Sequence, residues 1–432
     1  MAAGECGRVT IDLRLPPLWS DETESRIRRE AYSLDEQSKT QPKEVRFCAK
    51  CVVSNQRPRI TFDGQGVCSA CRYAERQRLL PDAGGICWEI RRQRLCELLD
   101  THRLQTGYDV IVPCSGGKDS AMVAHRLKHE YGMHPLCTTW APFAYTDIGW
   151  QNFQNFVHSG FDVITAFPNG LIHRKLARLA FEYKGDAWEP FAYGQLMYPL
   201  HMAARFGIGL VMGGENGEAI YSGDLSAADK PCYAYDDWER IYLKGSGVAR
   251  LVEIGRDLGV FSDADIRDLS GFYSMPDREA LANVQYHWLG YYIPWHPQSN
   301  YYYAQTHTGF EANPAGRSEG TYSKYASLDD RHDGFHFYLA HAKFGIARAT
   351  SDAAHEVRDG DRTRDEAVAL VQRYDGEFPG KHYDEFRAYL GIDHDQFQRV
   401  VARYRPPHLW DGDTLKHTVW YADKAADSPP GH

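Results

Sequence analysis

The stretch from Tyr108 to Ser120 constrains the fold of this chain more than any other. Its first part, Asp109-Val110-Ile111-Val112, contains the apolar run of a buried strand. The run enters a short polar turn, Cys114-Ser115-Gly116-Gly117, and residues 121–128 return to helical periodicity. The order of strand, glycine-bearing turn and helix predicts a layered fold of the α/β class.

The turn has the composition of an anion-binding loop. Gly116 and Gly117 allow backbone conformations that a Cβ opposes, so successive N–H groups can point at one anion beside a helix N-terminus. Ser115 and Ser120 add hydroxyl donors, and Lys118 adds a cation. The glycine spacing is not that of a Walker A motif. We therefore expect phosphate to bind here, although a tight strand-to-helix connection without a ligand is the plainer alternative.

The loop resembles the Ser-Gly-Gly-x-Asp-Ser signature of the PP-loop ATP pyrophosphatases, which include tRNA thiolases, GMP synthetase and asparagine synthetase. The resemblance implies that the β- and γ-phosphates of ATP are held as a leaving pyrophosphate while AMP is transferred, with Mg²⁺ spreading the charge. The implied ATP-binding residues are Ser115, Gly116, Gly117, Lys118, Asp119 and Ser120. Asp119 has two open roles, to help place the metal or to cap the helix.

Apolar strand patterns alternate with helical ones after this loop. We expect strands at 136–140, 162–167 and 208–212, and helices at 150–158, 172–183 and 198–206. The alternation predicts a doubly wound parallel sheet, whose ligands bind beyond the carboxyl ends of the strands. The loops after Cys114, Trp140, Phe167 and Met212 should therefore line the site.

Glu215 and Asn216 follow the last of these predicted strands. They are our candidates for handling the substrate or ammonia. A carboxylate at a helix N-terminus is the plainer interpretation of Glu215.

Two Cys-x2-Cys pairs precede the loop, Cys48 with Cys51 and Cys68 with Cys71, separated by sixteen residues. This spacing fits a tetrahedral zinc site with four thiolate ligands, and Asp63-Gly64 supplies a turn between the pairs. Disulfides or an iron–sulfur cluster are the alternatives. Four protein ligands close the coordination shell, so the predicted Zn²⁺ is structural and not catalytic.

The charge and hydropathy of the chain exclude several classes of protein. A formal charge of -9 argues against a general nucleic-acid binder, which would present a basic face. The chain has no run of eighteen or more apolar residues, and its start, Met1 to Thr10, is polar where a signal peptide would be apolar. We expect a cytoplasmic protein without membrane insertion and with reduced cysteines.

We expect five segments along the chain. They are an N-terminal extension (1–44), a four-cysteine zinc module (45–85), a PP-loop ATP-binding domain of HUP-like α/β fold (86–223), an insertion or lid (224–290) and a helical C-terminal region on the substrate side (291–432). A plain helical subdomain is the alternative to the insertion or lid. The extension lacks a sustained apolar period and should be weakly ordered, with a short amphipathic helix at 22–32 as the alternative. In the last segment Lys343 and Arg348 flank a glycine break, each either meeting an anionic substrate or ending a solvated helix.

Several motifs together resemble the N-acetyl sugar amidotransferase family, over residues 45–390. They are Tyr108 to Ser120, Arg57-Pro58-Arg59-Ile60-Thr61-Phe62 between the cysteine pairs, Gly213-Gly214-Glu215-Asn216-Gly217-Glu218, Glu319-Gly320-Thr321-Tyr322, and Lys343 to Thr350. The family belongs to lipopolysaccharide and flagellin-glycan pathways, including the pseudaminic acid branch. The resemblance implies an N-acetyl sugar substrate, nucleotide-linked or nonulosonic, whose acetamido group becomes an acetamidino group.

The loop chemistry suits that reaction. An amide oxygen is a poor leaving group, but its attack on the α-phosphorus of ATP gives an O-adenylyl imidate, from which ammonia can expel AMP. The catalytic candidates are Lys118, Asp119, Cys114, Glu215 and Asn216. The chain shows no glutaminase signature, since Ala2 stands where an N-terminal nucleophile would be. Ammonia must come from free ammonium or, as in some family members, from a glutaminase and synthase pair.

Two other functions remain open. Cys114 directly before the loop could carry a persulfide, as in a PP-loop sulfur transferase that makes a thioamide, or it could be a buried thiol at a strand end. The chain could also be a zinc-knuckle binding module with a degenerate loop that docks RNA. The acidic balance and the complete loop motif count against this last function.

Overall fold

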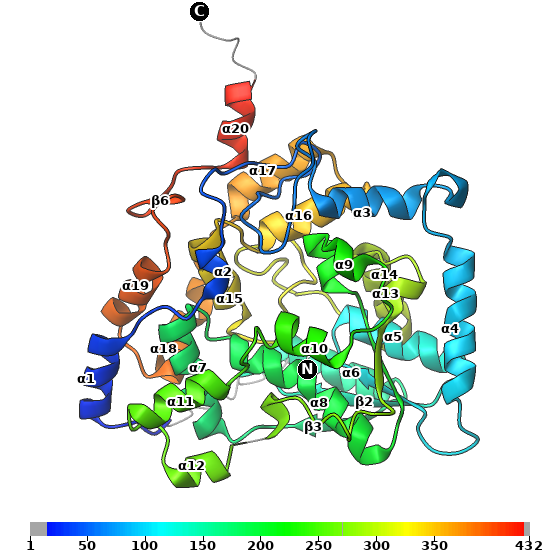
Figure 1. The fold of residues 1–432 in the computed structure, drawn as a ribbon, viewed down its shortest axis with the longest axis horizontal. Helices are drawn as coiled ribbons and strands as arrows, with labels where there is room; N and C mark the ends of the chain where they lie inside the picture. The colour runs from blue at the N-terminus through cyan, green and yellow to red at the C-terminus, as the bar shows by residue number, and fades with distance from the viewer. Residues whose placement is uncertain (1–14, 270, 427–432) are drawn as a thin grey trace, which may run out of the picture.

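The computed structural model describes residues 15–269 and 271–426. A five-stranded sheet in the order β3-β2-β1-β4-β5 organises the chain (Figure 1). Its strands are β1 (Val110–Pro113), β2 (Pro135–Trp140), β3 (Asp162–Ala166), β4 (Leu210–Gly213) and β5 (Gln285–Trp288). All neighbouring strands are parallel, which confirms the predicted α/β fold.

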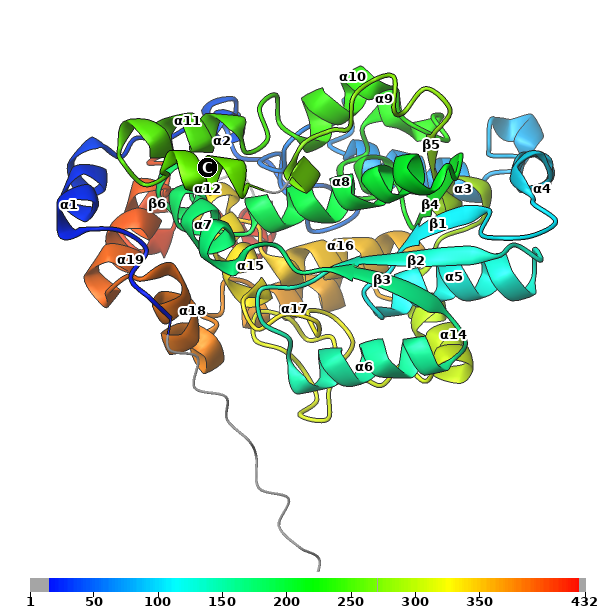
Figure 2. The same ribbon diagram turned by 90° about the horizontal axis from the view of Figure 1, so that it is seen from below.

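Helices cover both faces of the sheet (Figure 2). On one face α8 (Glu189–Phe206) packs across β1, β2 and β4, with α7 (Gly170–Lys184) beside it. On the other face lie α5 (Lys118–His129) and α6 (Asp147–His158), and α14 (Pro297–Thr308) packs along α5. The strand order reverses at β1, so the crevice beyond the carboxyl ends of β1 and β4 is the expected ligand position.

The strands and helices expected between residues 136 and 212 are all present, and α8 begins earlier than expected, at Glu189. The fifth strand was not anticipated. β5 is Gln285-Tyr286-His287-Trp288, a short run with two polar residues that carries no clear strand signal. Its aromatic rings pack against Trp238, which gives this edge of the sheet its core. The rest of that region forms α9 (Leu225–Ala228), α10 (Tyr235–Asp237), α11 (Ala249–Asp257), α12 (Asp263–Arg267) and, after β5, α13 (Leu289–Tyr292).

The C-terminal region is helical, as predicted, apart from the small hairpin of β6 (Trp410–Asp411) and β7 (Thr414–Leu415). Its helices are α15 (Asp333–Phe344), α16 (Arg348–Asp359), α17 (Arg364–Tyr374), α18 (Tyr383–Leu390), α19 (His394–Arg403) and α20 (Val419–Ala426). One apolar cluster joins α15, α18 and α19 to α7. A second joins α16 and α17 to the four-cysteine segment, which lies over them in Figure 1. These two clusters bind the C-terminal region to the rest of the chain.

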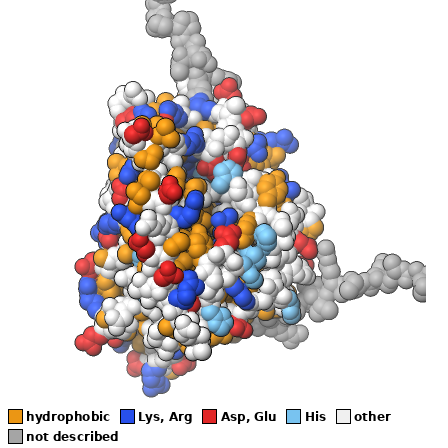
Figure 3. Space-filling model, turned by 90° about the vertical axis from the view of Figure 1, so that its right-hand side faces the viewer, with side chains coloured by type: hydrophobic (Ala, Val, Ile, Leu, Met, Phe, Trp, Pro, Cys, Tyr) orange, Lys and Arg blue, Asp and Glu red, His pale blue; other side chains and the backbone are white. Residues whose placement is uncertain are grey.

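The segment before the sheet contains α1 (Asp21–Glu30), α2 (Glu36–Lys39), α3 (Ser69–Arg78) and α4 (Trp88–His102). Figure 3 shows the side of the molecule on which α4 lies, where Lys and Arg side chains are interspersed with Asp and Glu. This face therefore lacks the continuous basic surface of a general nucleic-acid binder.

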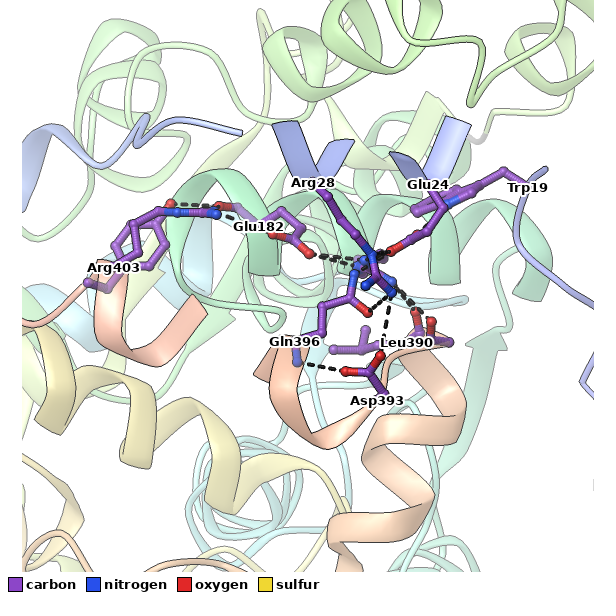
Figure 4. Close-up of polar contacts among 11 residues, drawn as sticks. Trp19, Glu24, Arg28, Glu182, Leu390, Asp393, Gln396 and Arg403 are labelled. Atoms are coloured by element: carbon purple, nitrogen blue, oxygen red, sulfur yellow. Dashed lines mark hydrogen bonds and ion pairs between the residues drawn. The ribbon is translucent and has the colours of Figure 1, made fainter. Parts of the chain in front are cut away.

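The N-terminal segment is anchored through a buried arginine on α7. Arg178 is fully buried, and its guanidinium donates to Glu24 of α1 and to Glu182 of its own helix, at 3.0 Å each. It also donates to the carbonyl of Leu390 at 3.1 Å, so three elements meet at one side chain. Figure 4 shows the partners from these elements, Glu24, Glu182 and Leu390, gathered in one place. The expectation of a weakly ordered extension is thus wrong for residues 15–44, and residues 1–14 lie outside the described part.

Arg178→Met is expected to lower the free energy of unfolding by about 3–5 kcal/mol, because Glu24 and Glu182 both lose their buried counter-charge. Among the described residues, Glu182 then keeps only Arg403, at 3.4 Å. Burial raises the pKa of Glu24, but Arg178 and several hydrogen bonds outweigh it and lower that pKa to about 2. A lowered carboxyl pKa stabilises the fold above the unfolded value and loses its effect as the pH falls through the folded one. The difference between wild type and variant should therefore shrink as the pH falls from 5 to 2.

Urea unfolding at several pH values measures this effect. Arg28→Met is the matched control, since Arg28 also pairs with Glu24 but its side chain is 43% exposed. Arg28→Met should lower the free energy of unfolding by at most about 1 kcal/mol. Equal losses in the two variants would contradict the structural role given to Arg178.

Candidate functional site

Cys48, Cys51, Cys68 and Cys71 form a buried cluster. The Sγ atoms of Cys48 and Cys71 are 3.8 Å apart, as are those of Cys51 and Cys68, and all four lie within 4.8 Å of one another. Zn–S bonds of about 2.3 Å in a tetrahedron place the sulfurs about 3.8 Å apart, so the thiols fit a zinc ion as they stand. All four are free cysteines, not disulfides. The cluster is therefore compatible with the predicted structural zinc.

Backbone amides and a buried arginine surround the cluster. The N–H groups of Lys50, Cys51 and Cys68 point at Cys48 Sγ at 3.3, 3.4 and 3.3 Å. Arg358 of α16 donates through Nη1 to Cys51 Sγ at 3.8 Å. Such outer donors orient thiolates and offset their charge. The end of α16 is thereby tied to the cysteine cluster.

The loop after β1 takes the form that its glycines predict. Gly116 has a φ of +84°, and a Cβ there would lie 2.6 Å from the Cα of Phe153 in α6. Only glycine fits both constraints. No side chain caps α5, whose N-cap is Gly117, so the first amides of that helix are free to bind an anion.

Two cavities meet at this loop. The loop cavity, of about 400 Å³, is lined by Ser115, Gly117 and Ser120, and by Trp140 and Pro142 after β2. The second, of about 330 Å³, we name the Arg57 cavity after the residue that the four-cysteine segment contributes to its wall. The residues common to both are Lys118, Asp119, Glu215, Tyr325, Ala326 and Arg348.

Three of the four loops expected to line the site do so, those after Cys114, Trp140 and Met212. The loop after Phe167 contributes to neither cavity, and the Phe167 side chain is 70% exposed. β3, which precedes it, is the edge strand farthest from the point where the strand order reverses. Distance from that crevice explains why this loop stays outside the site.

The charged groups of the loop are held by neighbours from distant segments. Lys118 forms an ion pair with Asp119, and its Nζ lies 5.4 Å from the centre of the Tyr325 ring. Asn300 of α14 donates to Asp119 at 2.9 Å. Ser120 donates to the carbonyl of Gly117 at 3.1 Å. The predicted ATP-binding residues therefore lie together in one ordered turn.

Asp329 is a site residue that the sequence did not reveal. Ser115 donates to its Oδ2 at 2.7 Å, and burial raises its pKa to about 6 although that hydrogen bond lowers it. The segment is held against α6, where the amide of Thr146 donates to the Asp329 carbonyl at 3.2 Å and a Cβ on Gly149 would meet Leu328 O at 2.7 Å. The acidic pair Asp329-Asp330 was the available signal, but it follows no strand.

Glu215 lies where the two cavities join. Burial, together with the nearby Asp119, raises its pKa to about 7, although Lys118 and the Tyr221 hydroxyl oppose the shift. Tyr221 belongs to a π-helical turn, Glu218–Ser222, that places its ring in the Arg57 cavity. A carboxyl group with a pKa near neutrality can both accept and donate a proton at working pH.

Asn216 points elsewhere. It is 4% exposed and lines neither cavity. Its Oδ1 accepts from Tyr233 at 2.7 Å and from the amide of Ala219 at 3.3 Å, while its Nδ2 donates to the carbonyl of Ala227 at 3.2 Å. These bonds fix the chain after Glu215, and a direct role of Asn216 with substrate or ammonia stays a prediction.

Cys114 lies beneath the loop. It is 3% exposed, belongs to the main apolar core and lines neither cavity. Its neighbour is Cys137 of β2, whose thiol pKa is raised by burial and by Cys114. The arrangement matches the buried strand-end thiol of the sequence analysis more closely than an accessible sulfur carrier.

The two cations around the glycine break have different surroundings, and neither ends a solvated helix. Lys343 is buried, where its Nζ donates to the carbonyl of Lys184 at 3.0 Å and pairs with Asp35 at 3.1 Å. Arg348 lines both cavities and pairs with Asp352 at 2.9 Å. Of the two, Arg348 alone is placed to meet a ligand of these cavities.

Residues 319–422 match the model of a family described as LPS biosynthesis protein WbpG-like, C-terminal domain. The matched segment is similar to that domain and includes Asp329 and Arg348, which line the loop cavity. No curated protein matches the chain. Within the described residues, no helix is both long enough and apolar enough to span a bilayer.

Proposed function

We propose that this protein is an ATP-dependent amidotransferase that converts the acetamido group of an N-acetyl sugar into an acetamidino group during surface-glycan biosynthesis. The observation that carries the proposal is the anion-binding loop at the junction of two cavities, with Glu215 between them. The similarity of residues 319–422 to an LPS biosynthesis domain supports the pathway, because that segment helps to form both cavities.

In the first step ATP occupies the loop cavity. The free amides at the start of α5 and the cation of Lys118 hold the β- and γ-phosphates. The Mg²⁺ that accompanies ATP would be held by Asp119, and it would offset the charge of the leaving pyrophosphate. The amide oxygen of a sugar in the Arg57 cavity attacks the α-phosphorus, the bond from that phosphorus to the bridging oxygen of the β-phosphate breaks, and the amide proton passes to water. The products are pyrophosphate and an O-adenylyl imidate.

In the second step ammonia adds to the imidate carbon, and the C–O bond to AMP breaks. Glu215, with a pKa of about 7, takes the proton that the adding nitrogen releases. One oxygen of the acetamido group thus leaves on AMP and one nitrogen replaces it. The ammonia source, free ammonium or a glutaminase and synthase pair, and a cytoplasmic location are parts of the same proposal.

The alternative is a sulfur transferase that makes a thioamide through a persulfide on Cys114. The burial of Cys114 beneath the loop favours nitrogen, since a sulfur carrier must reach both its donor and the activated carbon. The zinc-knuckle module without activity is disfavoured by the ordered loop and its cavities.

Mass analysis of the product tests the proposal. The purified protein is incubated with ATP, Mg²⁺, a panel of acetamido sugars and either ammonium or sulfide. We expect AMP, pyrophosphate and a sugar in which NH replaces O, with isotope-labelled ammonium labelling the product. Lys118→Ala should abolish all three. A thioamide product would contradict the amidotransferase assignment. The absence of AMP with every donor would favour a zinc-knuckle binding module without activity.

Glu215→Gln is expected to lower kcat/KM by about 100-fold or more, because it removes the proton acceptor of the second step. The wild-type rate, at constant free ammonia, should rise with pH through about 7 as the carboxyl ionises. The variant should lose this inflection while still binding ATP. A variant that keeps the same inflection would assign the titration to another group.

A further inference from the structure

Arg57 projects from the four-cysteine segment into the wall of the Arg57 cavity. Its own backbone is fixed by two turn bonds, from its amide to Ser54 O at 3.4 Å and from the amide of Ile60 to its carbonyl at 3.3 Å. Its guanidinium lies 5.9 Å from the centre of the Tyr221 ring. The cysteine-bearing segment therefore contributes directly to a cavity that opens onto the loop.

The guanidinium of Arg57 lacks an anionic partner. Its Nη1 donates to Ser351 Oγ at a long 3.4 Å, and its Nε is shielded from solvent with no hydrogen bond. Within residues 15–269 and 271–426, no carboxylate lies within ion-pair distance of it; the nearby Glu218 is engaged by Arg59 through two bonds of 2.6 Å. Burial lowers its pKa to about 10, which leaves it a cation at neutral pH.

The other cations of the cavity wall already have carboxylate partners. Lys118 pairs with Asp119, and Arg348 with Asp352. Of the remaining carboxyl groups, Glu356 pairs with Arg362 and Tyr322, Asp361 lies beside His296, and Asp359 lies beside His355. Glu215 has no cationic partner at ion-pair distance among the described residues, and with a pKa of about 7 it is only partly ionised at neutral pH. A shielded cation without a counter-charge is costly, and a guanidinium offers a planar fork that matches carboxylate or phosphate oxygens.

We propose that Arg57 binds an anionic group, a carboxylate or a phosphate, on the sugar that accepts nitrogen, so that the four-cysteine segment is a wall of the acceptor site and not only a support. The inference rests on the proposed function and assigns to one residue the anionic group, carboxylate or phosphate, that a nonulosonic or nucleotide-linked acetamido sugar carries. Tyr221 lies between the two ends of such a substrate, since its ring faces Arg57 and its hydroxyl is close enough to Glu215 to lower the pKa of that carboxyl. The acetamido group then lies at Glu215 and the anion at Arg57.

Charge-matched acceptors test the inference in the full-length protein. The probes are N-acetylneuraminic acid and its methyl ester, and N-acetylglucosamine with and without a phosphate at the anomeric oxygen. Binding is measured by calorimetry and turnover by AMP release. We expect the acid or the phosphate ester to bind at least about 10-fold more tightly than its neutral partner. The pair that shows this difference identifies whether Arg57 binds a carboxylate or a phosphate.

Arg57→Met should raise the Kd and KM of the charged probe by about 30-fold or more. The Kd and KM of the neutral probe should change by less than about 2-fold, and the Kd of ATP should not change. Arg57→Lys should give an intermediate value, because it keeps the charge and loses the fork. Arg72→Met is the matched control, since Arg72 lies in the same segment and pairs with Asp63 and Glu75 outside the cavity. Zinc content and Tm are recorded for each variant.

Three results would overturn the inference: no preference for either charged probe, an equal loss with charged and neutral probes in Arg57→Met, or the same loss in Arg72→Met. Failure of the proposed function has a different signature. In that case no probe yields AMP, while the calorimetric preference for the charged sugar and its dependence on Arg57 are still measured.

Discussion

Gly116→Ala is expected to lower ATP-dependent AMP formation by about 100-fold or more. The φ of Gly116 is +84°, and a Cβ there would lie 2.6 Å from the Cα and 2.8 Å from the amide nitrogen of Phe153. Both atoms belong to the backbone of α6, which cannot turn aside as a side chain can. The loop must therefore shift, and a displacement of about 1 Å in a group that positions phosphate costs about 100-fold in rate.

Gly117→Ala is the structural control for this substitution. Gly117 has a φ of -67°, and an added Cβ would meet only Ser115 Oγ at 3.3 Å and Asp329 Oδ2 at 3.7 Å. Without ATP, the Gly117→Ala variant should have a Tm close to that of wild type. The Gly116→Ala variant should have both a lower Tm and a lower affinity for ATP. Differential scanning calorimetry and titration with ATP measure the two quantities. Wild-type ATP affinity in Gly116→Ala would contradict the account of the loop.

Removal of the metal is the second large effect that we expect. Cys48→Ser, or treatment with a strong chelator, should remove the bound zinc and lower the Tm by at least about 10 °C, since structural zinc contributes about 10–16 kcal/mol to folding in small domains. Three backbone amides point at Cys48 Sγ, and the four cysteines belong to the same apolar cluster as buried residues of α16 and α17. Loss of the ion therefore loosens both sides of this packing.

Elemental analysis and calorimetry check this prediction. Cys96→Ser is the control, because Cys96 is an exposed cysteine outside the cluster and should keep both metal and Tm. If the segment is also a wall of the acceptor site, partial metal loss should weaken binding of a charged acetamido sugar before it weakens ATP binding at the loop. A Cys48→Ser protein with full zinc and wild-type Tm would exclude a structural four-thiolate site.

Local patterns were sufficient for much of the fold. The parallel sheet followed from apolar strands that alternate with helices, because period and length are properties of adjacent residues. The cysteine cluster followed from the spacing of two pairs, because each Cys-x2-Cys turn presents both thiols to one point. The short strand β5 was missed, since it has two polar residues and packs against Trp238, which is distant from it along the chain.

The candidate site divides in the same way. The sequence by itself determined the form of the loop after β1, because a positive φ and free helix amides depend on residues next to one another. It placed Glu215 at a strand end, but it could not separate that residue from Asn216, whose amide turns into the protein. Which of two adjacent side chains faces a cavity depends on the atoms packed around both of them.

Only the tertiary structure brought Arg57 and Asp329 to the loop. Arg57 lies before the sheet and Asp329 far beyond it, yet they line the two cavities that meet at Lys118. Their contacts join residues more than two hundred positions apart, Arg57 with Ser351 and Ser115 with Asp329. A sequence pattern records which residues are neighbours along the chain, whereas burial, charge compensation and the shape of a cavity are set by segments that meet only after folding.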